Sequence, residues 1–154
     1  MCGIMGYNGK QNAIPIVIKG LKSLEYRGYD SAGIAIVNNN KIDTVKSIGK
    51  IANLEKEIPN NLDGVVGIGH TRWATHGGVT IENCHPHTVN DITLVHNGII
   101  ENYLDIKEKL IKKGYKFIGE TDSEVLCGLI DYYNKEIEDK ILAIEKVINE
   151  IEGS

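Results

Sequence analysis

The chain has 154 residues, which is enough for one domain with a hydrophobic core and too few for two ordinary ones. Apolar residues make up 42% and charged residues 25%, and the net charge of −4 without a basic stripe argues against nucleic acid as a partner. No apolar run approaches the length of a membrane span and the N-terminus lacks a secretion signal, so we expect a cytoplasmic protein with no membrane partner.

The first half of the chain carries three clear element signals. Apolar spacing over residues 12–26 predicts a helix, with Asn12 as its N-cap and Pro15 in the first turn. The face expected to be buried carries Ile14, Val17, Ile18, Leu21 and Leu24. Two β-rich runs then flank the three asparagines at 38–40 and predict a hairpin. Residues 62–72 read as a buried strand that ends in polar residues.

In the second half, residues 92–98 predict a buried strand and residues 99–114 an amphipathic helix that Gly114 ends. A further helix begins with a capping box of Thr121 and Glu124. Its expected buried stripe is Val125, Leu126, Leu129, Ile130 and Tyr133, and that of a last helix is Ile141, Ile144, Ile148 and Ile151. Mixed strands and helices indicate an α/β or α+β class. The helix that runs to the end of the chain leads us to expect a truncated domain.

Most of the unusual side chains stand at strand ends. All five histidines lie between residues 70 and 96, together with Arg72 and the only tryptophan, Trp73. Each residue has a structural alternative: an ordinary hydrogen-bonded histidine, a surface ion pair for Arg72, and a core position for Trp73. Asn97–Gly98 reads equally as a turn, and Asp122 as a residue that favours a helix N-terminus. The density of these groups in one short span favours a functional site.

Three cysteines, Cys2, Cys84 and Cys127, form no CxxC pair, and an odd number argues against a disulfide scaffold. Cys127 lies in an apolar helical stripe and reads as a small buried hydrophobe. A zinc site is one alternative, because the acceptable ligand types gather in His76, Cys84, His85 and His87. Pro86 interrupts this set and no HExxH motif is present, so we expect no metal.

Cys2 is the candidate for a catalytic cysteine. Removal of Met1 would make it the first residue, with a thiol and a free α-amine on one carbon. The α-amine has a pKa of roughly 7.7–8.0, so near neutral pH a useful fraction is free to accept the thiol proton, most plausibly through a water. One residue then supplies both nucleophile and base. MCG alone is a weak signal for this chemistry.

The motifs MCGIMGY, LEYRGYDSAGIAI, GHTRWATHG, HPH, HNGIIENY and ETDSEV occur in this order. Together they resemble the glutaminase part of glutamine–fructose-6-phosphate aminotransferases, class II glutamine amidotransferases with an N-terminal-nucleophile hydrolase fold. The resemblance runs from Met1 to Ser154. Amidophosphoribosyltransferase and asparagine synthetase share the cysteine start and an HNG-like element but not this set. The glutaminase part of another class II amidotransferase is the alternative.

The resemblance implies a role for each motif residue. Cys2 would attack the glutamine amide, and Asn97 with Gly98 would form the oxyanion hole. Arg72 would bind the α-carboxylate and Asp122 the α-ammonium of glutamine. The substrate site would also be lined by Thr75, His76 and Gly77. Arg27 would support Cys2, Trp73 would gate ammonia passage, and His85 would support the site from behind. The remaining His70, His87 and His96 read as structural.

The resemblance also implies the fold and the partners. We expect an α+β, four-layer αββα sandwich of antiparallel sheets, with residues 1–154 forming an incomplete glutaminase domain. The sugar-isomerase domains, which bind fructose 6-phosphate and form glucosamine 6-phosphate, are expected to be absent. Glutamine is the expected substrate, no cofactor is implied, and the full-length enzyme is expected to be a homo-oligomer. The alternative is an inactive module that binds glutamine or docks on a partner.

Overall fold

The structure is a computed structural model that describes residues 2–74 and 77–154. Its elements in chain order are β1 Gly3–Asn8, α1 Ala13–Leu24, the 3₁₀ turn η1 Glu25–Arg27, β2 Ser31–Asn38, β3 Lys41–Ile48, α2 Ile51–Glu57, β4 Val66–Arg72, β5 His87–Val89, β6 Ile92–Leu94, α3 Tyr103–Lys112, α4 Asp122–Glu136 and α5 Lys140–Glu150. Among the described residues no helix is both long and apolar enough to cross a lipid bilayer.

A four-stranded sheet in the order β1-β4-β2-β3 forms the first half, and every neighbouring pair is antiparallel. The predicted hairpin is confirmed, since β2 and β3 pair through a turn at Asn39 and Asn40. Both turn residues have positive φ, 47° and 62°, which matches the twist of the flanking strands. The register places Thr71 opposite both Gly3 and Ala32, so the polar end of β4 reaches the head of β1.

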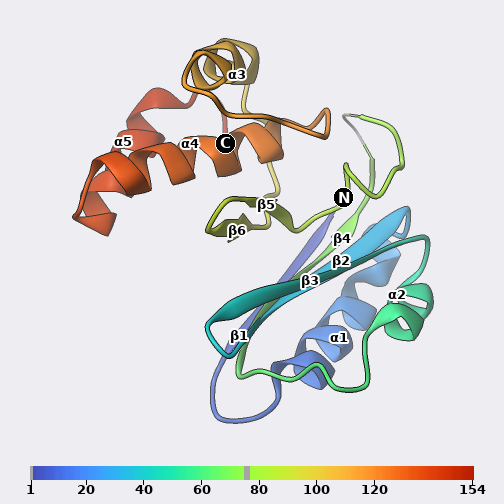
Figure 1. Ribbon diagram of the computed structural model, residues 1–154. Helices are drawn as coiled ribbons and strands as arrows, with labels where there is room; N and C mark the ends of the chain where they lie inside the picture. Colours follow the sequence, from blue (N-terminus) through green and yellow to red (C-terminus); the bar gives the residue numbers. More distant parts are fainter. Residues whose placement is uncertain (1, 75–76) are drawn as a thin grey trace.

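One face of this sheet is covered by α1 and α2 (Figure 1). The predicted start of α1 is confirmed, because the side chain of Asn12 accepts a hydrogen bond of 3.0 Å from the backbone of Ile14. The apolar core between the helices and the sheet contains Ala13, Val17, Ile18, Leu21, Ala32, Ile34, Ile36, Ile51 and Leu54. Alternate residues of β4 therefore face away from this core, toward the second half of the molecule.

The second half stacks on the other side of the sheet. The two-stranded antiparallel pair of β5 and β6 lies between the large sheet and α4 (Figure 1). A second apolar core holds α3, α4 and α5 together through Ile100, Ile106, Leu110, Val125, Leu129 and Val147. The order of layers is helix, sheet, sheet, helix, and the class is α+β with antiparallel pairing, as the resemblance implied.

Three sequence expectations in the second half are wrong in detail. The predicted strand over 92–98 is only Ile92–Leu94 and is half-buried, because the backbone leaves the ladder to form the HNG segment. The predicted helix over 99–114 begins only at Tyr103, since residues before it pair with the chain end. In α5 the expected stripe is largely exposed, with Ile141 at 74% and Ile148 at 61%, because Ala143 and Val147 face the core instead.

Candidate active site

Cys2 stands directly before β1, at the end of that strand which pairs with the end of β4. Its sulfur accepts a hydrogen bond of 3.3 Å from the backbone N–H of Trp73, and its thiol lies 3.6 Å from the Trp73 carbonyl oxygen. Pairing of β1 with β4 brings the two residues together, although they are far apart in sequence. Cys2 is thus held by the backbone of Trp73, the residue that directly follows β4.

Asn97 connects Cys2 to His70. Its side-chain nitrogen donates to the Cys2 carbonyl oxygen at 3.3 Å, and its side-chain oxygen lies 2.8 Å from Nε2 of His70. Because a carbonyl oxygen can only accept, the amide nitrogen must face Cys2, and Nε2 of His70 must carry the proton that the amide oxygen accepts. His70 therefore fixes the orientation of the Asn97 amide, and one amide N–H is left to point elsewhere.

Arg72 ends β4 and is 4% exposed, so the surface-ion-pair alternative is wrong. Its guanidinium donates to the carbonyl oxygens of Gly78 at 3.0 Å and Gly77 at 3.4 Å. Gly77, one of the predicted substrate residues, is exposed and has a φ of +73°. The arginine thus ties the 77–78 loop to the end of β4, beside Cys2.

Asp122 begins α4 and is buried. One carboxylate oxygen accepts from the backbone N–H of Ile100 at 2.9 Å, and the other from the N–H of Ser123 at 2.8 Å. The preceding Thr121 is the N-cap, as predicted, and accepts from the N–H of Glu124 at 3.2 Å. The helix N-terminus also favours a negative charge at this position. The expected return bond of the capping box does not form, because the Glu124 carboxylate binds the N–H groups of Ile118 and Gly119.

These groups meet around one narrow cavity of about 50 Å³. Its lining consists of Cys2, Arg72, Trp73, His85, His96, Asn97, Gly98, Thr121, Asp122 and Ser123. The wall carries a thiol, a guanidinium and a carboxylate, with amide donors between them. An arginine and an aspartate on one small cavity complement the two charged ends of an amino acid, with the thiol placed near its side chain.

Apart from His85, the other residues predicted for the site are Trp73 and Arg27, which the structure describes, and Thr75 and His76. Trp73 is 44% exposed and meets the ring of Tyr29 edge-on at 5.8 Å, so it is not a core residue. Arg27 ends η1, and the adjacent Gly28 lies against the backbone of Arg72 and Trp73, the stretch that holds the Cys2 sulfur. The other two predicted substrate residues, Thr75 and His76, lie outside the described residues.

Three histidine rings pack together at the cavity, with His85 stacked on His70 and edge-on to His87. The His85 ring lies 4.1 Å from that of His70 and 4.5 Å from that of His87, measured between centroids. Burial lowers the pKa of His70 to about 4 and that of His87 to about 3, and it lowers the pKa of His85 as well. All three are therefore neutral at pH 7. His85 is 6% exposed, and among the described residues neither of its ring nitrogens has a hydrogen-bond partner.

The other two cysteines are buried, and all three cysteines of the described chain are free thiols. Burial raises the pKa of the Cys127 thiol to about 12 and also raises that of Cys84. The interpretation of Cys127 as a small buried hydrophobe is confirmed. Within residues 2–74 and 77–154, no three His, Cys, Asp or Glu side chains are placed to hold a metal ion. Cys2 is thus the one half-exposed thiol of the described chain.

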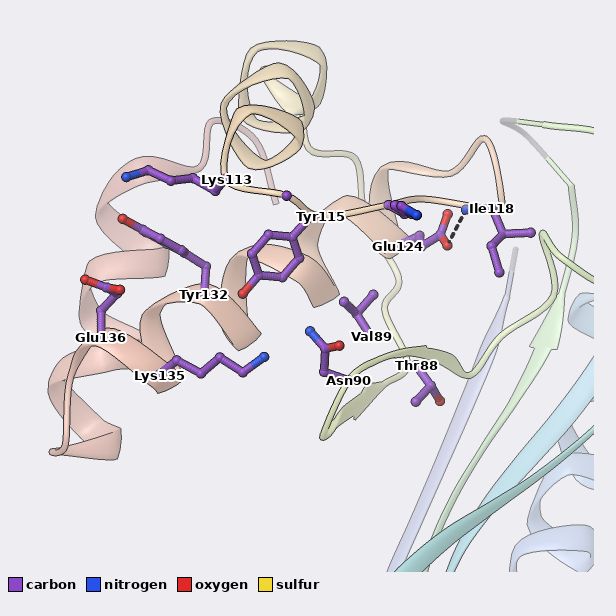
Figure 2. A pocket seen from close by; sticks show the side chains of 12 residues that line it. Thr88, Val89, Asn90, Lys113, Tyr115, Ile118, Glu124, Tyr132, Lys135 and Glu136 are labelled. Atoms are coloured by element: carbon purple, nitrogen blue, oxygen red, sulfur yellow. Dashed lines mark hydrogen bonds between the residues drawn. The ribbon is translucent and has the colours of Figure 1, made fainter.

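A larger cavity, of about 620 Å³, lies elsewhere in the second half (Figure 2). Figure 2 shows it between the β5–β6 turn and the face of α4, with Tyr115, Tyr132 and Lys135 on its wall. It shares no lining residue with the Cys2 cavity and contains no nucleophilic thiol. The thiol in its wall therefore favours the smaller cavity as the active site.

Sequence reasoning missed several residues of the site. His70 and His96 were read as purely structural, whereas His70 orients Asn97 and His96 lines the cavity next to Ser123, with 3.0 Å between its Nδ1 and the Ser123 hydroxyl. The available signal was the polar run TDS at a helix start, which places Thr121 and Ser123 beside Asp122. These three residues share the first turn of α4 and its N-cap.

Comparison with known proteins identifies the family of the chain and several relatives. The chain matches the family of class-II glutamine amidotransferases over residues 28–152. It is 52% identical over 165 positions to the glutamine–fructose-6-phosphate aminotransferase (isomerizing) of Methanosarcina mazei, and 52% identical over 157 positions to that of Clostridium tetani. Both alignments cover 100% of this chain and 26% of the relative, so the chain spans about a quarter of the length of these relatives.

Solved structures with the same fold include the glutamine phosphoribosylpyrophosphate amidotransferase of B. subtilis with ADP and GMP. It has a TM-score of 0.82 at 28% identity and covers 99% of this chain and 33% of its own. A structure described as the allosteric regulatory enzyme of purine biosynthesis has a TM-score of 0.84 at 28% identity, covering 100% of this chain and 34% of its own.

Proposed function

The chain belongs to the class-II glutamine amidotransferases, and we propose that it hydrolyses the side-chain amide of glutamine with Cys2 as the nucleophile. The observation that carries this proposal is the convergence of Cys2, Arg72 and Asp122 on one cavity together with Asn97 and Gly98. The guanidinium and the carboxylate would bind the α-carboxylate and α-ammonium of the substrate. This leaves the amide end of the side chain beside the thiol.

In the first step, the α-amine of Cys2, freed by removal of Met1, takes the thiol proton. The sulfur then attacks the amide carbon, and the carbonyl oxygen gains negative charge. The side-chain N–H of Asn97 and the backbone N–H of Gly98 would donate to this oxyanion. Loss of one such donor typically costs roughly 2.7–4 kcal/mol of barrier. Nε2–H of His70 holds the Asn97 amide in the donating orientation.

The tetrahedral intermediate then breaks its carbon–nitrogen bond. The nitrogen leaves as ammonia with the proton held by the Cys2 amine, and a glutamyl thioester remains on the sulfur. Water attacks the thioester, the same amine takes its proton, and glutamate leaves as the thiol is restored. Apart from the attacking water, all groups in these steps belong to residues 2–122 or to the substrate, and the steps require no metal or redox cofactor.

The acceptor of the ammonia is inferred from the names of the relatives. We propose that the ammonia is destined for fructose 6-phosphate, since the relatives with 52% identity are named for transfer to that sugar phosphate. Residues 1–154 would then belong to the glutaminase domain of such an enzyme, whose full assembly would be a homo-oligomer. Three free cysteines, one of them the nucleophile, favour a reducing compartment such as the cytoplasm.

The test is glutamate release from glutamine by the wild type and by Cys2→Ala, with Cys127→Ala as the matched control. Both substitutions remove one thiol, but Cys127 lies in the core with its thiol facing backbone carbonyl oxygens. We expect Cys2→Ala to lose all measurable turnover and Cys127→Ala to retain it. Turnover that survives in Cys2→Ala would assign the chemistry to another nucleophile. Glutamine binding without turnover in the wild type would favour a binding module.

A further inference from the structure

The last residues of the chain form a backbone ladder with the HNG segment. The N–H of Ile99 donates to the Ser154 carbonyl oxygen at 2.6 Å, and the N–H of Ser154 donates to the Ile99 carbonyl oxygen at 3.0 Å. The N–H of Glu101 donates to Glu152 at 2.8 Å, and Ile100 lies opposite Gly153 as an antiparallel bridge. We call residues 99–102 and 150–154 with these bonds the terminal ladder.

Asn102 fastens the same ladder with its side chain. Its amide nitrogen donates to the Glu150 carbonyl oxygen at 2.8 Å, and its amide oxygen accepts from the N–H of Glu152 at 2.9 Å. Two side-chain bonds and three backbone bonds therefore connect residues far apart in sequence. These bonds hold residues 150–154 in a defined position beside residues 99–102.

Two glycines make the close approach in the terminal ladder possible. A Cβ on Gly153 would lie 2.1 Å from the Ile99 carbonyl oxygen, and one on Gly98 would lie 1.7 Å from the Ser154 carbonyl oxygen. Gly153 also has a φ of +107°, which side chains rarely adopt. The close approach of Ser154 thus requires a glycine at position 98, in addition to the proposed role of Gly98 as oxyanion donor.

The terminal ladder touches the candidate site at two points. Ile99 directly follows Gly98, whose N–H is the proposed oxyanion donor. Ile100 donates its N–H to the Asp122 carboxylate at 2.9 Å, and Asp122 is the proposed partner of the substrate ammonium. A shift of residues 99–100 would therefore move both the oxyanion donor and the ammonium site.

We propose that Gly153 is a positioning residue for glutamine hydrolysis, acting through residues 99–100 on Gly98 and Asp122. The proposal rests on the proposed glutaminase function. The ladder is joined to the oxyanion donor by the peptide bond between Gly98 and Ile99, but to the ammonium partner Asp122 only by one hydrogen bond from Ile100. The oxyanion donor acts in the transition state, whereas Asp122 acts in substrate binding. Disturbing the ladder should therefore lower kcat more than it raises KM.

The chain offers a matched control at Gly114. This glycine follows α3 and has a φ of +91°, and apart from its two chain neighbours no described atom lies within 4 Å of a Cβ built on it. Gly114→Ala and Gly153→Ala therefore impose a similar backbone strain, but only Gly153→Ala presses on Ile99. Asn102→Ala is a second test, because it removes two bonds of the ladder without adding an atom.

The experiment measures kcat and KM for glutamine in Gly153→Ala, Gly114→Ala and Asn102→Ala, with the melting temperature of each. We expect a tenfold or larger fall in kcat for Gly153→Ala, a smaller fall for Asn102→Ala, and wild-type kcat for Gly114→Ala. Hydrogen exchange at the Ile99 and Glu101 amides should speed up in Gly153→Ala and Asn102→Ala but not in Gly114→Ala. Both changes weaken the ladder that holds these amides against the carbonyl oxygens of Ser154 and Glu152.

The outcomes separate the two proposals. Equal kcat in Gly153→Ala and Gly114→Ala, at similar melting temperatures, overturns the positioning role. If Gly153→Ala does not fold, Asn102→Ala decides, and wild-type kcat in that variant overturns the proposal as well. If the wild type releases no glutamate, the proposed function fails, and the exchange rates still report whether Gly153 holds residues 99–101.

Discussion

The two halves of the molecule differ in where they bury their polar side chains. Between the four-stranded sheet and α1 the core is apolar, from Val17 and Leu21 to Ile34. The second half also has an apolar core, but it buries acidic, hydroxyl and imidazole side chains beside it. Asp131, with no exposed surface, accepts hydrogen bonds from Asn90, Tyr115 and Lys135. The sheet half buries polar side chains as well, with His70, Thr71 and Arg72 at the end of β4. The site lies where these residues meet the buried polar groups of the second half.

This difference has an energetic meaning. Apolar contacts are non-directional, whereas a buried polar group that loses its partner costs roughly 1–3 kcal/mol. The second half is therefore the part in which a single lost hydrogen bond changes geometry as well as stability. Conditions or substitutions that act on buried polar groups should affect the second half and the site first.

The largest such effect is expected from pH. His70 and His87 have folded-state pKa values of about 4 and about 3, and burial also lowers that of His85. In the unfolded chain each would protonate near pH 6.5. As pH falls from about 6.5 to about 4, the unfolded state binds protons that the folded state does not. The free energy of unfolding should fall by roughly 1.4 kcal/mol per pH unit for each imidazole.

Urea unfolding at several pH values measures this slope, and His85→Phe isolates one ring. Phenylalanine keeps a flat ring between His70 and His87 and removes a group that has no hydrogen-bond partner among the described residues. The slope between pH 6 and pH 4 should decrease by about one imidazole's share. An unchanged slope in this variant would show that His85 does not contribute to the loss of stability in acid.

A smaller effect compares the helix caps of the two halves. Asn12 caps α1 and Thr121 caps α4, each through a hydrogen bond to the backbone. Replacing either by alanine should lower the free energy of unfolding by about 1 kcal/mol. Thr121 also contacts Nε2 of His87 at 3.0 Å and lines the Cys2 cavity. Thr121→Ala should therefore reduce kcat/KM by roughly tenfold, a loss of about 1.4 kcal/mol, whereas Asn12→Ala should leave it unchanged.

Denaturant unfolding and glutamine kinetics on both variants make the comparison. Similar losses of stability with different losses of activity would support the division between the halves. Equal activity in Asn12→Ala and Thr121→Ala would mean that the N-terminus of α4 does not position the site.

The sheet half could be predicted well from the sequence, because its elements follow local rules. The stripe of α1, the Asn12 cap and the asparagine turn all depend on residues close in sequence. In α5 the same reasoning failed, because several isoleucines offered more than one apolar face. Only packing against α4 selects Ala143 and Val147.

The site was predictable in its residue types but not in its connections. Strand ends and motif resemblance indicated Cys2, Arg72, Asn97 and Asp122. The bond from His70 to Asn97 and the contact of Ser154 with the Gly98 segment depend on pairings between distant segments. No local pattern encodes these pairings, since antiparallel register and helix packing set them together.

Cys2, freed of Met1, is the proposed nucleophile for the glutamine amide. The most direct measurement is the intact mass of the protein after reaction with a glutamine analogue that carries a chloroketone in place of the amide. We predict one adduct on a chain that lacks Met1, mapped to Cys2, with Cys84 and Cys127 unmodified and excess glutamine slowing the reaction. A chain that retains Met1, or an adduct on any other residue, would contradict the account.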